Sequence, residues 1–260
     1  MELRSLSKSY GDLAVLEAIS FEVPSGTRVG IIGASGSGKS TLLRLIAGLE
    51  TPTRGEVLVD GLSVTGPGRE RALMFQSGGL YPWLTLRDNV AFALEAAGLK
   101  RAAARERAET WLSRVGLDGF EGYFPEKVSG GMQSRTALAR ALSTEPELLL
   151  LDEPFGALDA ITRMKLQETA LEVIRTTRAT MLLVTHDVDE ALYLTERLLV
   201  LSPHPGRLVA QHDVPRLEHA ERADPRLADL RRTLLAELGL VSSKSSTQAI
   251  TQAQIPEVLA

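Results

Sequence analysis

A glycine-rich loop followed by a lysine and two hydroxyl side chains lies near the start of this 260-residue chain. It fits the spacing G-x-x-x-x-G-K-[ST] and consists of Gly33, Ala34, Ser35, Gly36, Ser37, Gly38, Lys39, Ser40 and Thr41. Because glycine carries no Cβ, the backbone N–H groups of such a loop can surround phosphate oxygens while the following helix directs its positive end at them. We therefore predict a phosphate-binding loop in which Lys39 neutralises the β and γ phosphates of a nucleotide and the Ser40 hydroxyl ligates Mg²⁺.

Two adjacent carboxylates, Asp152 and Glu153, form a second candidate site. They follow the apolar segment 147–151, and α/β proteins bind their ligands at the carboxyl ends of such strands. Asp152 suits the metal side of the site. Glu153 suits a general base or a water-orienting group, a role that contributes a factor of about 10² to 10⁴ in rate. Together with the glycine loop, this pair predicts hydrolysis of a phosphoanhydride bond.

A third feature is Ser129, followed by Gly130 and Gly131 and then by the helical segment 136–142. Serine is a favoured N-cap, and a helix start with exposed glycine amides is a second place suited to bind an anion. Alone, this feature is typical of a simple capped helix. Its position between the loop and the carboxylates favours a part in nucleotide binding instead.

Taken in order along residues 1–205, these motifs resemble those of the ATP-binding subunits of ABC transporters. Loop 33–41 matches the Walker A motif of that family, segment 148–153 its Walker B strand and residues 129–131 its signature. The resemblance adds four positions, namely Tyr10 as the aromatic residue that stacks on adenine, Gln76 of the Q-loop, Asp159 of the D-loop and the switch histidine His186.

The resemblance also implies the role of each position. The implied catalytic residues are Lys39, Gln76, Glu153 and His186. The implied ATP-binding residues are those of loop 33–41 together with Tyr10, Gln76, Ser129, Gly130, Gly131 and Asp159, and the implied Mg²⁺ ligands are Ser40, Gln76 and Asp152. The sequence departs from the usual signature at Val128, Met132 and Ser134. These departures leave the serine and the glycines in place and bear on the rate of hydrolysis.

Partners follow from the same resemblance. Two copies are expected to form a homodimer, or one copy to pair with a homologous subunit, so that each ATP lies between the Walker A loop of one copy and the Ser129 helix start of the other. Integral membrane permease subunits are the expected partners, with a periplasmic or lipid-anchored solute-binding protein acting through them. The expected location is peripheral, at the cytoplasmic face of the inner membrane.

A finer resemblance, to importers of nitrate, sulfonates and taurine, lies in the stretches 66–71, 79–86, 88–92 and 201–207. We therefore expect the ATP-hydrolysing, energy-coupling subunit of an importer for one of these solutes or a similar one. Two alternatives stay open at this point: an importer ATPase for a different small molecule, and a soluble ABC ATPase without a transport role.

The elements that must position these residues alternate between apolar, β-rich segments and segments of helical period. This alternation predicts an α/β fold with a largely parallel sheet, and the Ser-Gly and Asp-Gly turns between the first strands favour an antiparallel β flank. The family resemblance implies that the core is a P-loop NTPase (RecA-like) fold. The expected strands are 2–7, 19–23, 28–32, 56–59, 72–75, 147–151, 180–184, 197–201 and 207–210, and the expected helices include 87–97, 102–115 and one that opens at Ser129.

We expect the ATP-binding domain to span 1–205, with a helical subdomain inserted at about 84–145. A C-terminal extension, 206–240, should contain an amphipathic helix that starts at Asp224 and Pro225, because its leucines recur at helical spacing. Residues 241–260 are expected to form a polar, flexible tail. Whether the extension regulates, dimerises or only packs stays open.

Composition excludes several classes of protein. The chain has no cysteine, which excludes disulfides and thiolate chemistry. A formal net charge of −4 argues against a nucleic-acid partner. No apolar run approaches the ~20 residues that a membrane-spanning helix needs, and the amino terminus lacks the features of a secretory signal, so a cytoplasmic location is expected.

Overall fold

The computed structural model describes residues 1–215 and 224–240; the tail expected at 241–260 lies outside this range. The strands are β1 (Glu2–Tyr10), β2 (Leu13–Glu22), β3 (Arg28–Gly33), β4 (Arg54–Val59), β5 (Leu62–Ser63), β6 (Arg71–Met74), β7 (Leu148–Asp152), β8 (Thr180–Val184), β9 (Arg197–Leu201) and β10 (Leu208–Asp213). The helices are α1 (Lys39–Ile46), α2 (Leu86–Ala96), α3 (Arg101–Arg114), α4 (Gly130–Ser143), α5 (Ala160–Thr177), α6 (Val188–Leu194) and α7 (Pro225–Glu237), with a short 3₁₀ turn at Pro125–Lys127.

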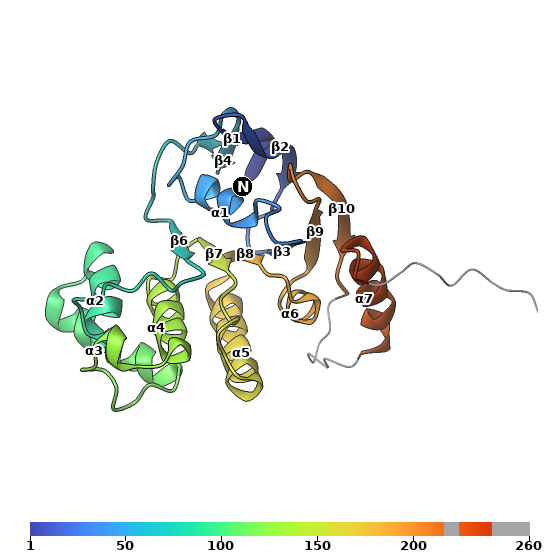
Figure 1. Cartoon of the computed structure of the whole chain (residues 1–260). Helices are drawn as coiled ribbons and strands as arrows, with labels where there is room; N and C mark the ends of the chain where they lie inside the picture. Colours follow the sequence, from blue (N-terminus) through green and yellow to red (C-terminus); the bar gives the residue numbers. More distant parts are fainter. Residues whose placement is uncertain (216–223, 241–260) are drawn as a thin grey trace, which may run out of the picture.

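Two sheets organise the chain. The larger has the strand order β10-β9-β3-β8-β7-β6 and is parallel except for β10, which runs antiparallel to β9. The smaller is antiparallel, in the order β2-β1-β4-β5. In Figure 1 the smaller sheet and α1 lie above the larger sheet, α5 and α6 lie below it, and α2, α3 and α4 form a group to one side. The expected parallel core, antiparallel flank and group of helices are therefore present.

The central strands are apolar throughout because both of their faces are covered. Along β7, Leu148 and Leu150 pack into the cluster that contains α1 and the smaller sheet. Leu149 and Leu151 point the other way, into the cluster formed by α2 to α5. Alternate residues of one strand thus hold two layers together, and the strand end that carries the carboxylates is fixed from both sides.

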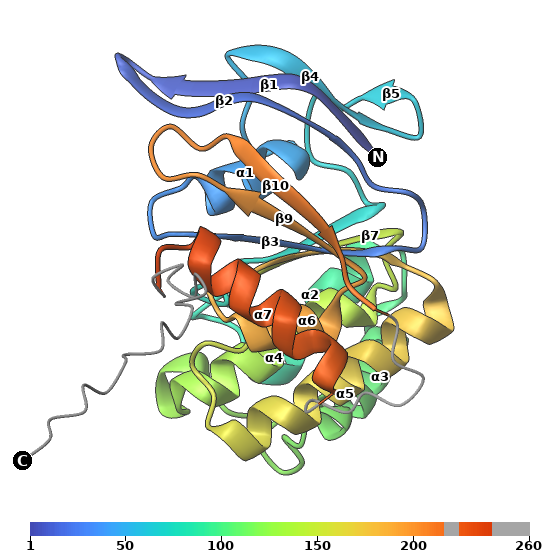
Figure 2. The same cartoon turned by 90° about the vertical axis from the view of Figure 1, so that its right-hand side faces the viewer.

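Helix α7 packs on the outer side of the core, beside α6 and β9 (Figure 2). Its Leu227 and Leu234 are buried in that cluster. The segment after residue 205 does not begin with this helix, because β10 first joins the larger sheet. None of the helices formed by residues 1–215 and 224–240 combines the length and the apolar character that a membrane crossing requires.

Several element bounds differ from the sequence expectations. Strand β2 begins at Leu13, well before the expected 19–23. Helices α5 and α6 were not among the expected elements. Each begins at an aspartate N-cap: the side chain of Asp159 accepts from the backbone N–H of Thr162, and that of Asp187 accepts from the backbone N–H of Glu190.

Candidate nucleotide site

The glycine loop joins β3 to α1, so its backbone N–H groups stand at the start of a helix. Gly36 and Gly38 have φ angles of 79° and 85°, in the left-handed region that L side chains rarely adopt. Space is also lacking: a Cβ on Gly36 would lie 2.8 Å from Nε2 of His204, and one on Gly38 would lie 2.6 Å from Cδ2 of Leu16. The positive φ angles therefore favour glycine at both positions, and a Cβ would also displace the side chain of His204 or Leu16.

The Lys39 side chain folds across this loop. Its Nζ donates to the carbonyl oxygens of Gly33, at 2.8 Å, and Ala34, at 3.0 Å, and the residue is 7% exposed. Burial lowers the pKa of Lys39, while the nearby carboxylates of Glu153 and Asp152 act in the opposite direction. The ammonium group thus lies between the loop and the acidic strand end, where phosphate charge would need to be neutralised.

Asp152 closes β7 and is buried. Burial is the main cause that raises the pKa of this carboxyl group, and the Ser40 hydroxyl that faces it acts to lower the pKa. The Oδ1 atom of Asp152 is buried and has no hydrogen-bond partner in the protein. An orphaned carboxylate oxygen beside a hydroxyl is a donor set that fits Mg²⁺, which proteins usually bind through one or two carboxylates together with phosphate and water oxygens.

No group of three or more His, Asp or Glu side chains within residues 1–215 and 224–240 could hold a metal by itself. The fit to Mg²⁺ rests instead on the orphaned oxygen of Asp152 and the Ser40 hydroxyl beside it. The residues of the chain therefore fit the ion that the glycine loop leads us to expect.

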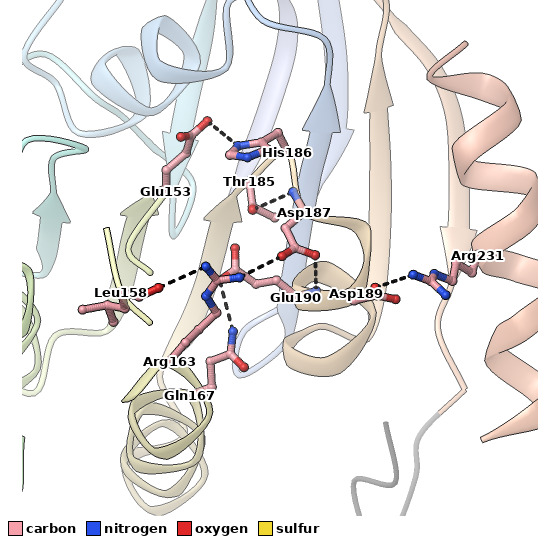
Figure 3. Close-up of polar contacts among 10 residues, drawn as sticks. All are labelled: Glu153, Leu158, Arg163, Gln167, Thr185, His186, Asp187, Asp189, Glu190 and Arg231. Atoms are coloured by element: carbon pink, nitrogen blue, oxygen red, sulfur yellow. Dashed lines mark hydrogen bonds and ion pairs between the residues drawn. The ribbon is translucent and has the colours of Figure 1, made fainter. Parts of the chain in front are cut away.

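Three of the predicted side chains, those of Gln76, Glu153 and His186, meet at Glu153, and Figure 3 shows the contact between Glu153 and His186. The Oε2 atom of Glu153 accepts a hydrogen bond from Nε2 of Gln76 at 2.9 Å, and its Oε1 lies 3.2 Å from Nδ1 of His186. The sheet explains this meeting: Gln76 follows β6, Glu153 follows β7 and His186 follows β8, and these strands are neighbours with β7 in the middle.

The backbone at Glu153 is unusual. Its φ is 47°, although it is not a glycine, and its N–H donates to the carbonyl of Val184 at 2.9 Å. Left-handed backbone in a non-glycine residue costs about 1 to 3 kcal/mol and persists only where neighbours hold it. The strand pairing with β8 therefore helps to hold the carboxylate of Glu153 toward Gln76 and His186.

Tyr10 ends β1, next to the start of α1. Its hydroxyl donates to a carboxylate oxygen of Glu50. Partial burial and this acidic neighbour raise the pKa of Tyr10, while its contact with Thr41 lowers it. Since Thr41 belongs to the glycine loop motif, this contact brings the hydroxyl of Tyr10 to the edge of that motif, and 46% of the residue is exposed.

The signature residues 129–131 lie at the start of α4, apart from loop 33–41. Ser129 is the N-cap of α4, where its Oγ accepts from the backbone N–H of Met132 at 3.3 Å. Ser129 and Gly130 are exposed. Within the described ranges, no hydrogen bond joins them to loop 33–41. Asp159 caps α5, and a contact of these residues with nucleotide stays a prediction.

Two polar residues of this region, Arg163 and Asp187, were not singled out from the sequence. Arg163 donates to Asp187 and to the carbonyl of Leu158 (Figure 3). The signal for Asp187 was present, because Asp-x-x-Glu before an apolar run, here Asp187 to Glu190, is a capping pattern. Arg163 carries no comparable local signal.

The fold and this site define a P-loop NTPase of the ABC ATPase type. Residues 16–156 match the protein family described as ABC transporter. The chain belongs to that family.

Among its relatives is the taurine import ATP-binding protein TauB of Burkholderia pseudomallei, which is 47% identical over 236 residues, or 88% of this chain and 91% of the relative. The aliphatic sulfonates import ATP-binding protein SsuB of Bacillus cereus is 46% identical over 202 residues, or 78% of this chain and 79% of the relative. A dimeric structure of a post-hydrolysis state of the ATP-binding cassette MJ0796, bound to ADP and Pi, is similar with a TM-score of 0.75 and 30% identity, covering 83% of this chain and 99% of that chain.

Proposed function

We propose that this chain is the ATP-hydrolysing, energy-coupling subunit of an importer for taurine, a sulfonate, nitrate or a similar small solute. The observation that carries the proposal is that Gln76 and His186 both contact the carboxylate of Glu153. The glycine loop lies next to them, and its Lys39 side chain folds across the loop toward the same site. A protein that only binds nucleotide would not need this arrangement of an acid, an imidazole and an amide.

In the proposed reaction Glu153 accepts a proton from the attacking water, and Gln76 and His186 hold its two oxygens in place. Lys39 and the loop amides bind the β and γ phosphates. Ser40, Asp152 and the Gln76 amide oxygen would hold Mg²⁺, which when bound neutralises negative charge on the phosphate oxygens. Tyr10 would stack on the adenine ring.

The active form would be a dimer of two head-to-tail copies, in which Ser129, Gly130, Gly131 and Asp159 of one copy approach the ATP of the other. The exposure of Ser129 and Gly130 in a single chain supports this arrangement. So does the similarity to a cassette solved as a dimer. Two-fold dimers are also the commonest form of oligomer.

Import would require permease subunits in the membrane and a solute-binding protein that delivers the solute to them. The names of the relatives, which state taurine import and aliphatic sulfonates import, support this assignment. A net charge of −4 gives no support for direct attraction to anionic lipid. Attachment to the cytoplasmic face of the inner membrane would therefore depend on the permease, and the enzyme would belong to the translocase class.

Three measurements test the proposal. The purified full-length chain should release phosphate from ATP in the presence of Mg²⁺ and should co-purify with a multi-spanning membrane protein. A strain that lacks the chain should fail to grow on taurine or an aliphatic sulfonate as the only sulfur source, or on nitrate as the only nitrogen source, and should grow on sulfate and ammonium. Normal growth on all of them would exclude these solutes, and the absence of a membrane partner would favour a soluble ABC ATPase.

A further inference from the structure

Behind the Glu153–His186 pair, Arg163 of α5 connects two loops (Figure 3). Its Nη2 donates to the carbonyl oxygen of Leu158 at 3.2 Å, and its Nη1 donates to Oδ2 of Asp187 at 3.3 Å. Leu158 lies in the segment that leads from Glu153 into α5, and Asp187 directly follows His186. One guanidinium group therefore contacts both segments that flank the candidate catalytic pair.

The loop around His186 is fixed through its backbone. The N–H of Asp187 donates to Oγ1 of Thr185 at 3.0 Å, and Oδ1 of Asp187 accepts from the N–H of Glu190 at 3.1 Å. One carboxylate oxygen of Asp187 thus caps α6 and the other faces Arg163. The side chain of His186 is itself 66% exposed. Packing does not hold the ring, so its position depends on its neighbours in the chain.

Leu158, the other residue that Arg163 contacts, is also held in place. Leu158 is buried, and a Cβ on Gly131 would lie 3.3 Å from its Cδ2 atom. The segment 157–159 is therefore packed against the signature of the same chain. A shift of this segment would therefore move the Arg163 side chain, which contacts Leu158, and would change its contact with Asp187 next to His186.

We propose that Arg163 is a positioning residue that couples segment 157–159 to the loop of His186 and so holds the imidazole at hydrogen-bonding distance from Glu153. The inference rests on the proposed ATPase activity. It extends that proposal to a residue that contacts neither Glu153 nor His186 directly.

If the Arg163–Asp187 ion pair served only to stabilise the fold, its loss would be expected to lower stability and not specifically the rate of hydrolysis. The side chains of Arg163 and Asp187 are 33% and 34% exposed, and pairs of such exposure contribute little to stability. A displaced catalytic group, in contrast, can lower a rate by about 100-fold for a shift of roughly 1 Å. Loss of Arg163 should therefore affect turnover far more than folding, and the two roles can be separated.

The experiment compares the full-length wild type with Arg163→Gln, Arg163→Lys and the control Arg175→Gln, which removes an exposed arginine near the far end of the same helix. For each we would measure kcat and KM for MgATP, the Kd for a non-hydrolysable ATP analogue and the Tm. We expect Arg163→Gln to lower kcat by about 10- to 100-fold, with KM, Kd and Tm close to those of wild type. Arg163→Lys should recover part of kcat, because its ammonium can still pair with Asp187. Arg175→Gln should match wild type.

A double-mutant cycle with Asp187→Asn completes the test. If Arg163 acts through Asp187, the double variant should lose no more kcat than the more severe single variant. The inference would be overturned if the fold-losses of kcat in the two single variants multiplied in the double variant. It would also be overturned if Arg163→Gln kept the wild-type kcat. A loss of kcat accompanied by a lower Tm and a weaker nucleotide affinity would overturn it as well. A wild-type chain that hydrolyses no ATP would instead refute the proposed function.

Discussion

Replacement of Glu153 by glutamine tests the candidate site most directly. The two carboxylate oxygens contact Gln76 and His186, and a glutamine of the same size can offer an oxygen to only one of them. It also cannot accept a proton from water. We therefore expect kcat to fall by about 10² to 10⁴, which corresponds to about 3 to 5 kcal/mol in the activation free energy.

Nucleotide binding should survive this change. The loop and Lys39 are untouched, and loss of the Glu153 charge removes a negative group that lies close to where anionic phosphates would bind. The variant should accumulate with ATP bound and form an ATP-stabilised dimer that wild type loses on hydrolysis.

The assay is steady-state phosphate release together with size-exclusion chromatography with and without MgATP. Glu147→Gln is the matched control, since it makes the same change at an exposed position just before the other end of β7. Full turnover by Glu153→Gln would refute the role of Glu153. Equal losses in the two variants would show that the effect comes from the strand and not from the carboxylate.

Three further predictions concern other parts of the chain. Burial raises the pKa of Glu190, so the folded protein binds a proton there more readily than the unfolded chain does, and the free energy of unfolding should fall as pH rises above the ordinary carboxyl value of 4.5. Glu190→Gln should remove this fall, so that in urea titrations its free energy of unfolding increases relative to wild type as pH rises above 4.5. A difference between the two proteins that does not change with pH would contradict this prediction. Leu234→Ala empties a fully buried position of α7 and should cost about 2 to 5 kcal/mol in urea unfolding, whereas Leu240→Ala, at a site 67% exposed, should change little. Gly36→Ala places an alanine with left-handed backbone against the ring of His204 and should raise the Kd for ATP by about 5- to 30-fold. Gly61→Ala has a similar φ of 78° but lies in open space, so it should leave the Kd for ATP unchanged. Equal changes in Kd in the two variants would show that the glycine loop does not contribute specifically to ATP binding.

The glycine loop could be predicted from the sequence because its geometry is local. Residues 33–41 and the elements on either side are contiguous, so spacing alone determines that a strand, a loop and a helix follow one another. The meeting of Gln76, Glu153 and His186 is different. It depends on the order of β6, β7 and β8 in the sheet, and no local pattern specifies which strands are neighbours. Only the family resemblance pointed to these three residues together.

The missed helices have physical explanations. Helix α6 spans only Val188–Leu194, which is too short for a periodic pattern to stand out. Helix α5 is longer, but it buries the polar Gln167, whose Nε2 donates to Glu190, among its apolar positions. Such a residue interrupts the apolar stripe on which sequence reasoning relies. In both cases the aspartate N-cap was the better signal.

The separation of the two candidate anion-binding helix starts within one chain supports the proposed dimer. The glycine loop follows β3, and α4 packs beside β6, with β8 and β7 in between. Three strand spacings of about 4.8 Å place these strands roughly 14 Å apart, and in the part of the chain that the structure describes no hydrogen bond joins Ser129 to loop 33–41. Yet Gly131 packs against Leu158, which lies beyond the carboxyl end of β7, so the signature and the glycine loop are near the same edge of the sheet. A second copy related by a two-fold axis at that edge would bring the Ser129 of each chain over the loop of the other, and the two helix starts could then bind one ATP from opposite sides.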